Sequence, residues 1–150
     1  MPFQLSSPTI SDRGTIPVRC TGDGEDLSPP LVWSDPPAGT KSFALALEDT
    51  DAPGGSFWHW GACNIPAAMR RLEEGDAAGG LKMAVNDFGR AGYGGPHPPR
   101  GDAPHRYHFR LAALDVETLP LGPATRVKDM WRAARQHVLA ETELVATYGR

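Results

Sequence analysis

Glycine and proline are the residues that most constrain the fold of this chain. There are 17 glycines and 15 prolines among 150 residues, about a fifth of the chain, whereas proteins average about 12% for the two together. They do not form a low-complexity tract, because they stand between short apolar runs. Short runs bounded by turn-forming residues are typical of β-strands. The spacing therefore predicts a mainly β protein, an antiparallel sandwich or barrel.

Six segments carry the strand pattern. The clearest is Ser42–Asp49, where Phe43, Leu45 and Leu47 alternate with alanine and glutamate, as expected when alternate side chains face opposite sides of a sheet. The other expected strands are Thr15–Cys20, Leu31–Trp33, Trp58–Ile65, Lys82–Asn86 and Arg106–Asp115.

A single segment has helical spacing, and it runs from Arg126 to Thr142. Its apolar residues are Val127, Met130, Trp131, Ala134 and Val138, which fall on one face of a helix. Thr125 is the expected N-cap. The final ELVATYGR is expected to be extended or irregular, and Met69–Gly75 is a candidate helical turn. With neither an internal repeat nor a long linker, residues 1–150 are expected to form one domain.

Composition excludes several classes of function. The formal net charge is −3 and basic residues do not cluster, which argues against nucleic acid and anionic membrane surfaces as partners. No apolar run approaches the roughly 18–20 residues that cross a bilayer. The N-terminal MPFQLSSPTISDRG lacks the pattern of a signal peptide, so we expect a cytoplasmic protein without an integral membrane segment. A signal peptide removed earlier stays open.

The sequence also lacks the usual marks of catalysis and of cofactor binding. It contains neither a GxSxG nucleophile motif nor a GxxxxGK[ST] phosphate loop, so we expect no cofactor and no enzyme activity. The two cysteines, Cys20 and Cys63, have no close second cysteine. Two buried free thiols are favoured over a disulfide, which sequence alone leaves open.

Three segments concentrate reactive side chains. In EDTDAP, Asp49 and Asp51 would share a side of an extended chain; they could orient an imidazole, or simply hold a turn. In FWHWGACN, His59 lies between two tryptophans and is either a packed ring or a polar group in a pocket wall. Both alternatives stay open in each segment.

The third segment is GYGGPHPPRGDAPHRYHF, residues 92–109. If RYHF is a strand, His105 shares a face with Tyr107 while His108 faces the other way, which argues against a metal pair. His97 lies between prolines and is expected to be exposed. The glycines could let successive N–H groups form an anion-binding nest, or the loop could be structural.

Taken in order, these segments resemble the phosphatidylethanolamine-binding protein family, also called Raf kinase inhibitor proteins, in its bacterial branch. The matching runs are DGEDLSPPLVWSDPPAGTKSFALALEDTDAP, WHWGACNIP, GYGGPHPPRGDAPHRYHFRLAALD and AARQHVLAETELVATYGR. The resemblance implies a large antiparallel sheet, a smaller sheet in Greek-key connection, and one or two helices. It also implies a cis peptide at Ala52–Pro53. Thr50 departs from the proline that the family has at the centre of its first box.

The resemblance further implies a pocket for a small phosphorylated or anionic ligand, such as phosphate or a phosphorylated head group. Its expected ligand-binding residues are Asp49, Asp51, His59, Tyr93, Gly95, Pro99, His105 and Tyr107. His59 and His105 would be the main donors, Asp49 would hold one imidazole, and Trp58 and Trp60 would line the pocket.

A regulatory binding protein is the leading interpretation of this resemblance, with an unidentified protein partner, a kinase or a protease. The alternative is a hydrolase, because histidine, aspartate and tyrosine in one pocket also suit acid–base chemistry. The natural ligand and the oligomeric state, including a homodimer, stay open.

Overall fold

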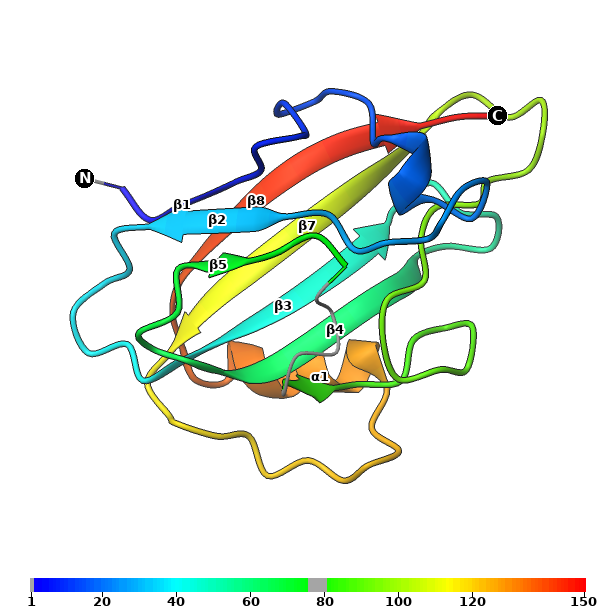
Figure 1. The fold of residues 1–150 in the computed structure, drawn as a ribbon. Coiled ribbons are helices and arrows are strands. Elements are labelled where there is room, and N and C mark those ends of the chain that lie inside the picture. The colour runs from blue at the N-terminus through cyan, green and yellow to red at the C-terminus, as the bar shows by residue number, and fades with distance from the viewer. Residues whose placement is uncertain (1, 76–80) are drawn as a thin grey trace.

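The structure is a computed structural model that describes residues 2–75 and 81–150. Figure 1 shows two antiparallel β-sheets stacked face to face, with an α-helix against the outer face of the larger one. The larger sheet has the order β6 (Lys82–Met83), β4 (Phe57–Pro66), β3 (Ser42–Asp49), β7 (His105–Leu114) and β8 (Val138–Tyr148). The smaller sheet has the order β1 (Gln4–Ser6), β2 (Leu31–Ser34) and β5 (Arg71–Leu72). The helix is α1 (Val127–Arg135).

Strand β3 lies at the centre of the larger sheet, and all eight of its residues are buried. Its large side chains, such as Phe43 and Leu47, point into the core between the two sheets. Ala44 and Ala46 on the opposite face lie beneath α1, and these short side chains let the helix approach the sheet. The alternation in the sequence therefore separates two buried layers here, rather than a buried face from a solvated one.

The sandwich fold and its main strands are as the sequence predicts. Ser42–Asp49 is confirmed residue for residue, and the other long strands agree within one residue at most ends. Cys20 and Cys63 are both free and buried, as favoured.

Several local predictions are wrong. Thr15–Cys20 is not a strand: Thr15 forms only an isolated bridge with Thr147, and Val18–Cys20 is a 3₁₀ turn. The expected strand Lys82–Asn86 stops at Met83, and residues within Met69–Gly75 form β5 rather than a helical turn.

The helix is also shorter than its apolar spacing predicts. It ends at Arg135 because the chain from Val138 onward pairs with β7 along the whole edge of the sheet. The alternating Leu144, Ala146 and Tyr148 enter the inter-sheet core, so pairing and burial override the helical period. The N-cap of α1 is Arg126, which makes no side-chain capping bond, rather than the predicted Thr125.

Candidate functional site

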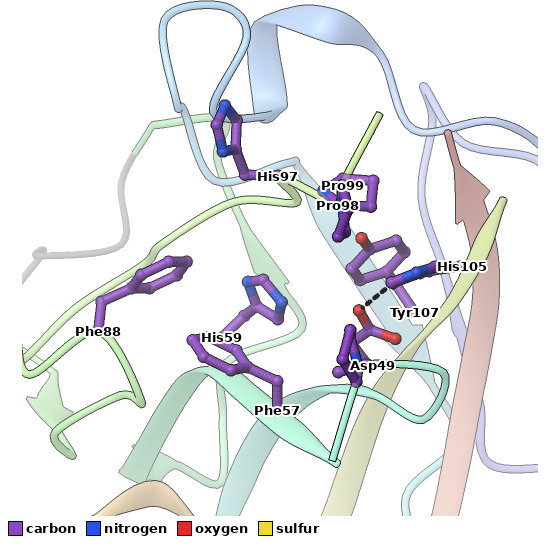
Figure 2. A pocket seen from close by; sticks show the side chains of 11 residues that line it. Asp49, Phe57, His59, Phe88, His97, Pro98, Pro99, His105 and Tyr107 are labelled. Atoms are coloured by element: carbon purple, nitrogen blue, oxygen red, sulfur yellow. Dashed lines mark hydrogen bonds and ion pairs between the residues drawn. The ribbon is translucent and has the colours of Figure 1, made fainter. Parts of the chain in front are cut away.

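A cavity of about 130 Å³ opens at one end of the larger sheet (Figure 2). Its walls come from the end of β3, the starts of β4 and β7, and the loops that join these strands. The lining residues are Asp49, Ala52, Pro53, Phe57, His59, Phe88, His97, Pro98, Pro99, His105 and Tyr107. The ends of three neighbouring strands therefore meet the Gly/Pro-rich loop at a single concave site.

Asp49 lies at the base of the cavity and holds His105. The backbone of Asp49 pairs with Phe57 on one side and with Tyr107 on the other, so His105 is its diagonal neighbour across the sheet. Asp49 Oδ2 lies 2.7 Å from His105 Nδ1, and both side chains are at most 5% exposed. The other carboxylate oxygen accepts the backbone N–H of Asp51 at 2.8 Å. Asp49 is thus fixed from two directions.

The second ring nitrogen of His105 also faces a carboxylate. Nε2 lies 3.1 Å from Asp102 Oδ2, and the Asp102 side chain is 42% exposed. Burial lowers the pKa of His105, but the hydrogen bonds with Asp49 and Asp102 outweigh it, and the pKa is raised above its ordinary value. His105 is therefore favoured as a cation between two carboxylates.

A β-bulge turns His59 into the cavity. Leu47 pairs with Trp60 and Glu48 with Trp58, which leaves His59 as the extra residue on β4. Bulges of this kind redirect side chains and are common beside functional sites. Because of this bulge, Trp58 packs beneath α1 and Trp60 packs in the inter-sheet core. The prediction that both tryptophans line the cavity is therefore wrong.

The His59 ring is attached to the Gly/Pro-rich loop. Its Nδ1–H donates to the Gly94 carbonyl oxygen at 2.7 Å, and the Gly94 N–H donates to the His59 carbonyl oxygen at 3.0 Å. Burial lowers the pKa of His59 below its ordinary value. His59 and His105 are therefore electrostatically different: His59 is favoured as a neutral imidazole and His105 as a cation.

Tyr107 contributes a buried hydroxyl that has no hydrogen-bond partner among the described residues. The residue is fully buried, and its ring packs 5.5 Å from that of His59 and 6.4 Å from that of His105. Burial, reinforced by the Asp49 carboxylate through its negative charge and its closeness to the hydroxyl, raises the pKa of Tyr107 well above its ordinary value. The hydroxyl therefore keeps its proton and can donate it to a ligand.

Phe57 and Phe88 form an apolar wall of the cavity that no sequence pattern indicates. Their ring centroids are 4.8 Å apart, and Phe88 is 46% exposed at the rim. Asn86 shapes the Phe88 loop, because its Oδ1 accepts the backbone N–H groups of Phe88 and Arg90 and its Nδ2 donates to Gly92. The segment NDFG, residues 86–89, contains the turn-forming residues of this loop, but nothing in it indicates contact with β4.

Three of the expected ligand-binding residues do not line the cavity. The Asp51 carboxylate accepts hydrogen bonds from the backbone and guanidinium of Arg106. The Tyr93 hydroxyl donates to the Cys20 carbonyl oxygen at 2.6 Å, and the Gly95 N–H donates to Asp26 at 2.7 Å. Each polar group is already satisfied within the protein, so these residues support the walls instead.

The loops around the cavity answer three further points. Of the two alternatives left open for the glycines, the structural loop holds at Gly94 and Gly95, because both N–H groups bond inside the protein. His97 is half exposed, as expected, yet it lines the cavity rim, 3.6 Å from Asp23. The expected cis peptide at Ala52–Pro53 is wrong: residues 2–75 and 81–150 contain no cis bond.

The strand-face prediction for the histidines is confirmed. His105 and Tyr107 both line the cavity, whereas the His108 ring lies on the opposite face, 3.1 Å from the Thr50 hydroxyl. Within the part of the chain that the structure describes, no group of three or more histidine, cysteine or acidic residues is arranged to hold a metal ion.

Comparison with known proteins places this architecture in a family. The sequence matches the family described as phosphatidylethanolamine-binding protein over residues 6–149. The chain belongs to the phosphatidylethanolamine-binding protein family. It superposes on the crystal structure of Escherichia coli YbcL, itself described as a member of the mammalian PEBP family, with a TM-score of 0.94 and 34% identity; the match covers 99% of this chain and 98% of YbcL.

Two curated relatives match nearly the whole of this chain and most of their own length. A UPF0098 protein of Aquifex aeolicus is 45% identical over 99% of this chain and 89% of its own length. LppC of Mycobacterium tuberculosis, which has "lipoprotein" in its name, is 35% identical over 98% of this chain and 72% of its own. Among the described residues of the present chain, no helix has the length and apolar character needed to cross a membrane.

Proposed function

We propose that this PEBP-family protein is a non-enzymatic binding protein whose cavity takes one small phosphorylated or anionic group. The observation that carries the proposal is the Tyr107 hydroxyl, which is buried at the cavity and has no partner in hydrogen-bond geometry among the residues that the structure describes. An unpaired buried donor costs free energy, and a ligand oxygen would satisfy it. The cationic form of His105 would supply a positive charge on the same wall.

The size of the cavity supports a head group rather than a whole lipid. Its volume of about 130 Å³, on a measure by which one water molecule needs roughly 10–15 Å³, is enough for phosphate or a small head group. An acyl chain is much larger. Asp102 is partly exposed, and in this proposal it is the carboxylate that an incoming anion replaces on His105.

The test is calorimetric titration with phosphate and with phosphorylethanolamine, using two tyrosine variants. Tyr107→Phe should weaken binding roughly 10- to 100-fold, because a hydrogen bond to a charged group contributes about 1.5–3 kcal/mol. Tyr93→Phe is the matched control, since the Tyr93 hydroxyl donates to Cys20 inside the core and does not line the cavity. Equal affinity for wild type and Tyr107→Phe would contradict the proposal.

Binding should also weaken as pH rises from 5 to 8. The pKa of His105 is raised, so the cation is present below that pKa and is lost as pH rises through it. An affinity that does not change over this range would show that the His105 cation does not contribute to anion binding.

A hydrolase is the alternative, because aspartate, histidine and tyrosine share the cavity. Against it, none of the residues that line the cavity in the described part of the chain is a serine, a cysteine or a lysine, and both oxygens of Asp49, the carboxylate that could act as a nucleophile there, are held by His105 and by the Asp51 N–H. Turnover of phosphoesters or glycosides that His105→Ala abolishes would decide for an enzyme.

Inhibition of an unidentified kinase or protease, a homodimeric state and a cytoplasmic location belong to the same proposal. The name of the LppC relative makes cell fractionation the test of location, and analytical ultracentrifugation tests for the dimer.

A further inference from the structure

The tautomer of His59 determines what the cavity can offer a ligand. A carbonyl oxygen only accepts hydrogen bonds, so the 2.7 Å contact with Gly94 places a proton on Nδ1. In a neutral imidazole the other nitrogen, Nε2, then carries a lone pair. With Nδ1 held by the loop, Nε2 is the ring nitrogen left to meet a ligand, and it is an acceptor.

The surroundings of His59 favour the neutral ring. The residue is 4% exposed, and its ring packs against those of Phe57 and Phe88 at 4.8 and 5.4 Å between centroids. Asp49 on β3 and Asp87 in the loop after β6 place negative charge nearby, and the Tyr107 ring faces it from β7. Burial outweighs the hydrogen bond to Gly94, the backbone of Gly95 and these carboxylates, all of which act to raise the pKa, so the pKa of His59 is lowered.

A ligand that bonds to both Tyr107 and His59 must therefore accept one hydrogen bond and donate another. Within residues 2–75 and 81–150 the Tyr107 hydroxyl is a buried donor without a partner in hydrogen-bond geometry, whereas His59 Nε2 is an acceptor. Figure 2 shows the two rings facing the same space, with Asp49 at its base. A bare oxyanion can satisfy the tyrosine, but it places a lone pair against the lone pair of the histidine.

We propose that the cavity selects an anion that carries its own proton, a phosphate monoester in its singly protonated form. Its P–OH donates to His59 Nε2, while another phosphoryl oxygen accepts from the Tyr107 hydroxyl. This inference rests on the proposed function and narrows its ligand class. Sulfate and phosphodiesters, which have no proton to donate near neutral pH, bind more weakly because they would cover His59 Nε2 without giving it a hydrogen-bond donor.

The experiment compares methyl phosphate, dimethyl phosphate and sulfate by calorimetry at pH 6, near the second pKa of a phosphate monoester. Methyl phosphate should bind at least about tenfold more tightly than either other anion, the effect expected for one unpaired buried group. Nitrogen-15 NMR of the imidazole should show His59 neutral, with its proton on Nδ1, both in the free protein and in the methyl phosphate complex.

The variant His59→Gln sharpens the test, because its side-chain amide can donate as well as accept. The preference for methyl phosphate over sulfate should fall below about threefold in this variant, the amide now supplying the donor that sulfate lacks. If the variant does not fold, the comparison of three anions and the wild-type NMR spectrum still decide.

The outcomes separate this inference from the function beneath it. Equal affinity for the three anions, or a doubly protonated His59 in the complex, would overturn the inference while leaving an anion site intact. Failure of all three anions to bind would overturn both. Tight methyl phosphate binding with a neutral His59 and weak sulfate binding would support both.

Discussion

Replacing Asp51 by asparagine tests whether this aspartate supports the cavity from outside. The Asp51 carboxylate accepts the backbone N–H of Arg106 at 2.7 Å and two guanidinium hydrogen bonds at 2.9 and 3.0 Å. The hydrogen bonds from Arg106 lower the pKa of Asp51 from 3.8 to about 2. This aspartate is therefore bound to the start of β7 rather than directed at a ligand.

The magnitude follows from the pKa. Lowering the pKa of Asp51 from 3.8 to about 2 corresponds to at most roughly 2 kcal/mol. The Asp51 and Arg106 side chains are 28% and 60% exposed, so solvent screening reduces this value. We expect Asp51→Asn to lower the free energy of unfolding by about 1 kcal/mol at pH 7.

The lowered pKa also determines how the stabilisation by Asp51 changes with pH. Because the pKa is lowered on folding, the stabilisation is fully present above the unfolded pKa of about 3.9 and is lost as pH falls through the folded value. Urea unfolding of wild type and Asp51→Asn between pH 2 and 7 should therefore show curves that converge near the acid limit. Glu73→Gln is the control, since Glu73 and its partner Arg71 are both more than 60% exposed.

Two results would refute this reasoning. One is a stability difference that stays constant down to pH 2, which would show that the charge of Asp51 is not responsible. The other is a loss of more than about tenfold in phosphate affinity, equal to about 1.4 kcal/mol, in a stably folded Asp51→Asn protein. That loss would make Asp51 a ligand-binding residue after all.

Three further substitutions test the packing and the electrostatics. Gly61→Ala should cost roughly 1–3 kcal/mol in urea unfolding, because its Cβ would lie 2.8 Å from the Val127 methyl groups; a neutral effect would mean that α1 can shift. Asn86→Ala should cost about 1–3 kcal/mol and weaken phosphate binding, since two loop N–H groups lose their acceptor; unchanged stability would contradict this role. Asp49→Asn should lower the pKa of His105 in an NMR titration, because the carboxylate helps to raise it. Stability supplied by the His105 cation is present at low pH and lost as pH rises through its folded pKa, so this variant should flatten that dependence, and an unshifted titration would refute the pairing.

Residue patterns predicted the parts of the site that depend on strand geometry alone. The parity of residues along a strand separated His105 and Tyr107 from His108, and the structure confirms this separation. The position of Asp49 at the end of β3 also followed from a pattern of alternating apolar residues. These features are local, so they can be read from one segment.

The rest depends on contacts between distant segments. The bulge at His59 arises from pairing with β3, and it places Trp60 in the inter-sheet core instead of in the cavity wall. Phe88 reaches the cavity only because Asn86 folds the preceding loop back on itself. The satisfied N–H of Gly95 depends on Asp26, 69 residues away in sequence, a contact that composition and spacing do not contain.

A crystal structure of the complex with methyl phosphate at pH 6 would show whether the cavity binds a protonated phosphoryl group. We expect one phosphoryl group in the cavity, with one oxygen within hydrogen-bond distance of the Tyr107 hydroxyl and another within hydrogen-bond distance of His59 Nε2. Methyl phosphate bound elsewhere on the protein, or bound in the cavity without contacting either group, would contradict this expectation.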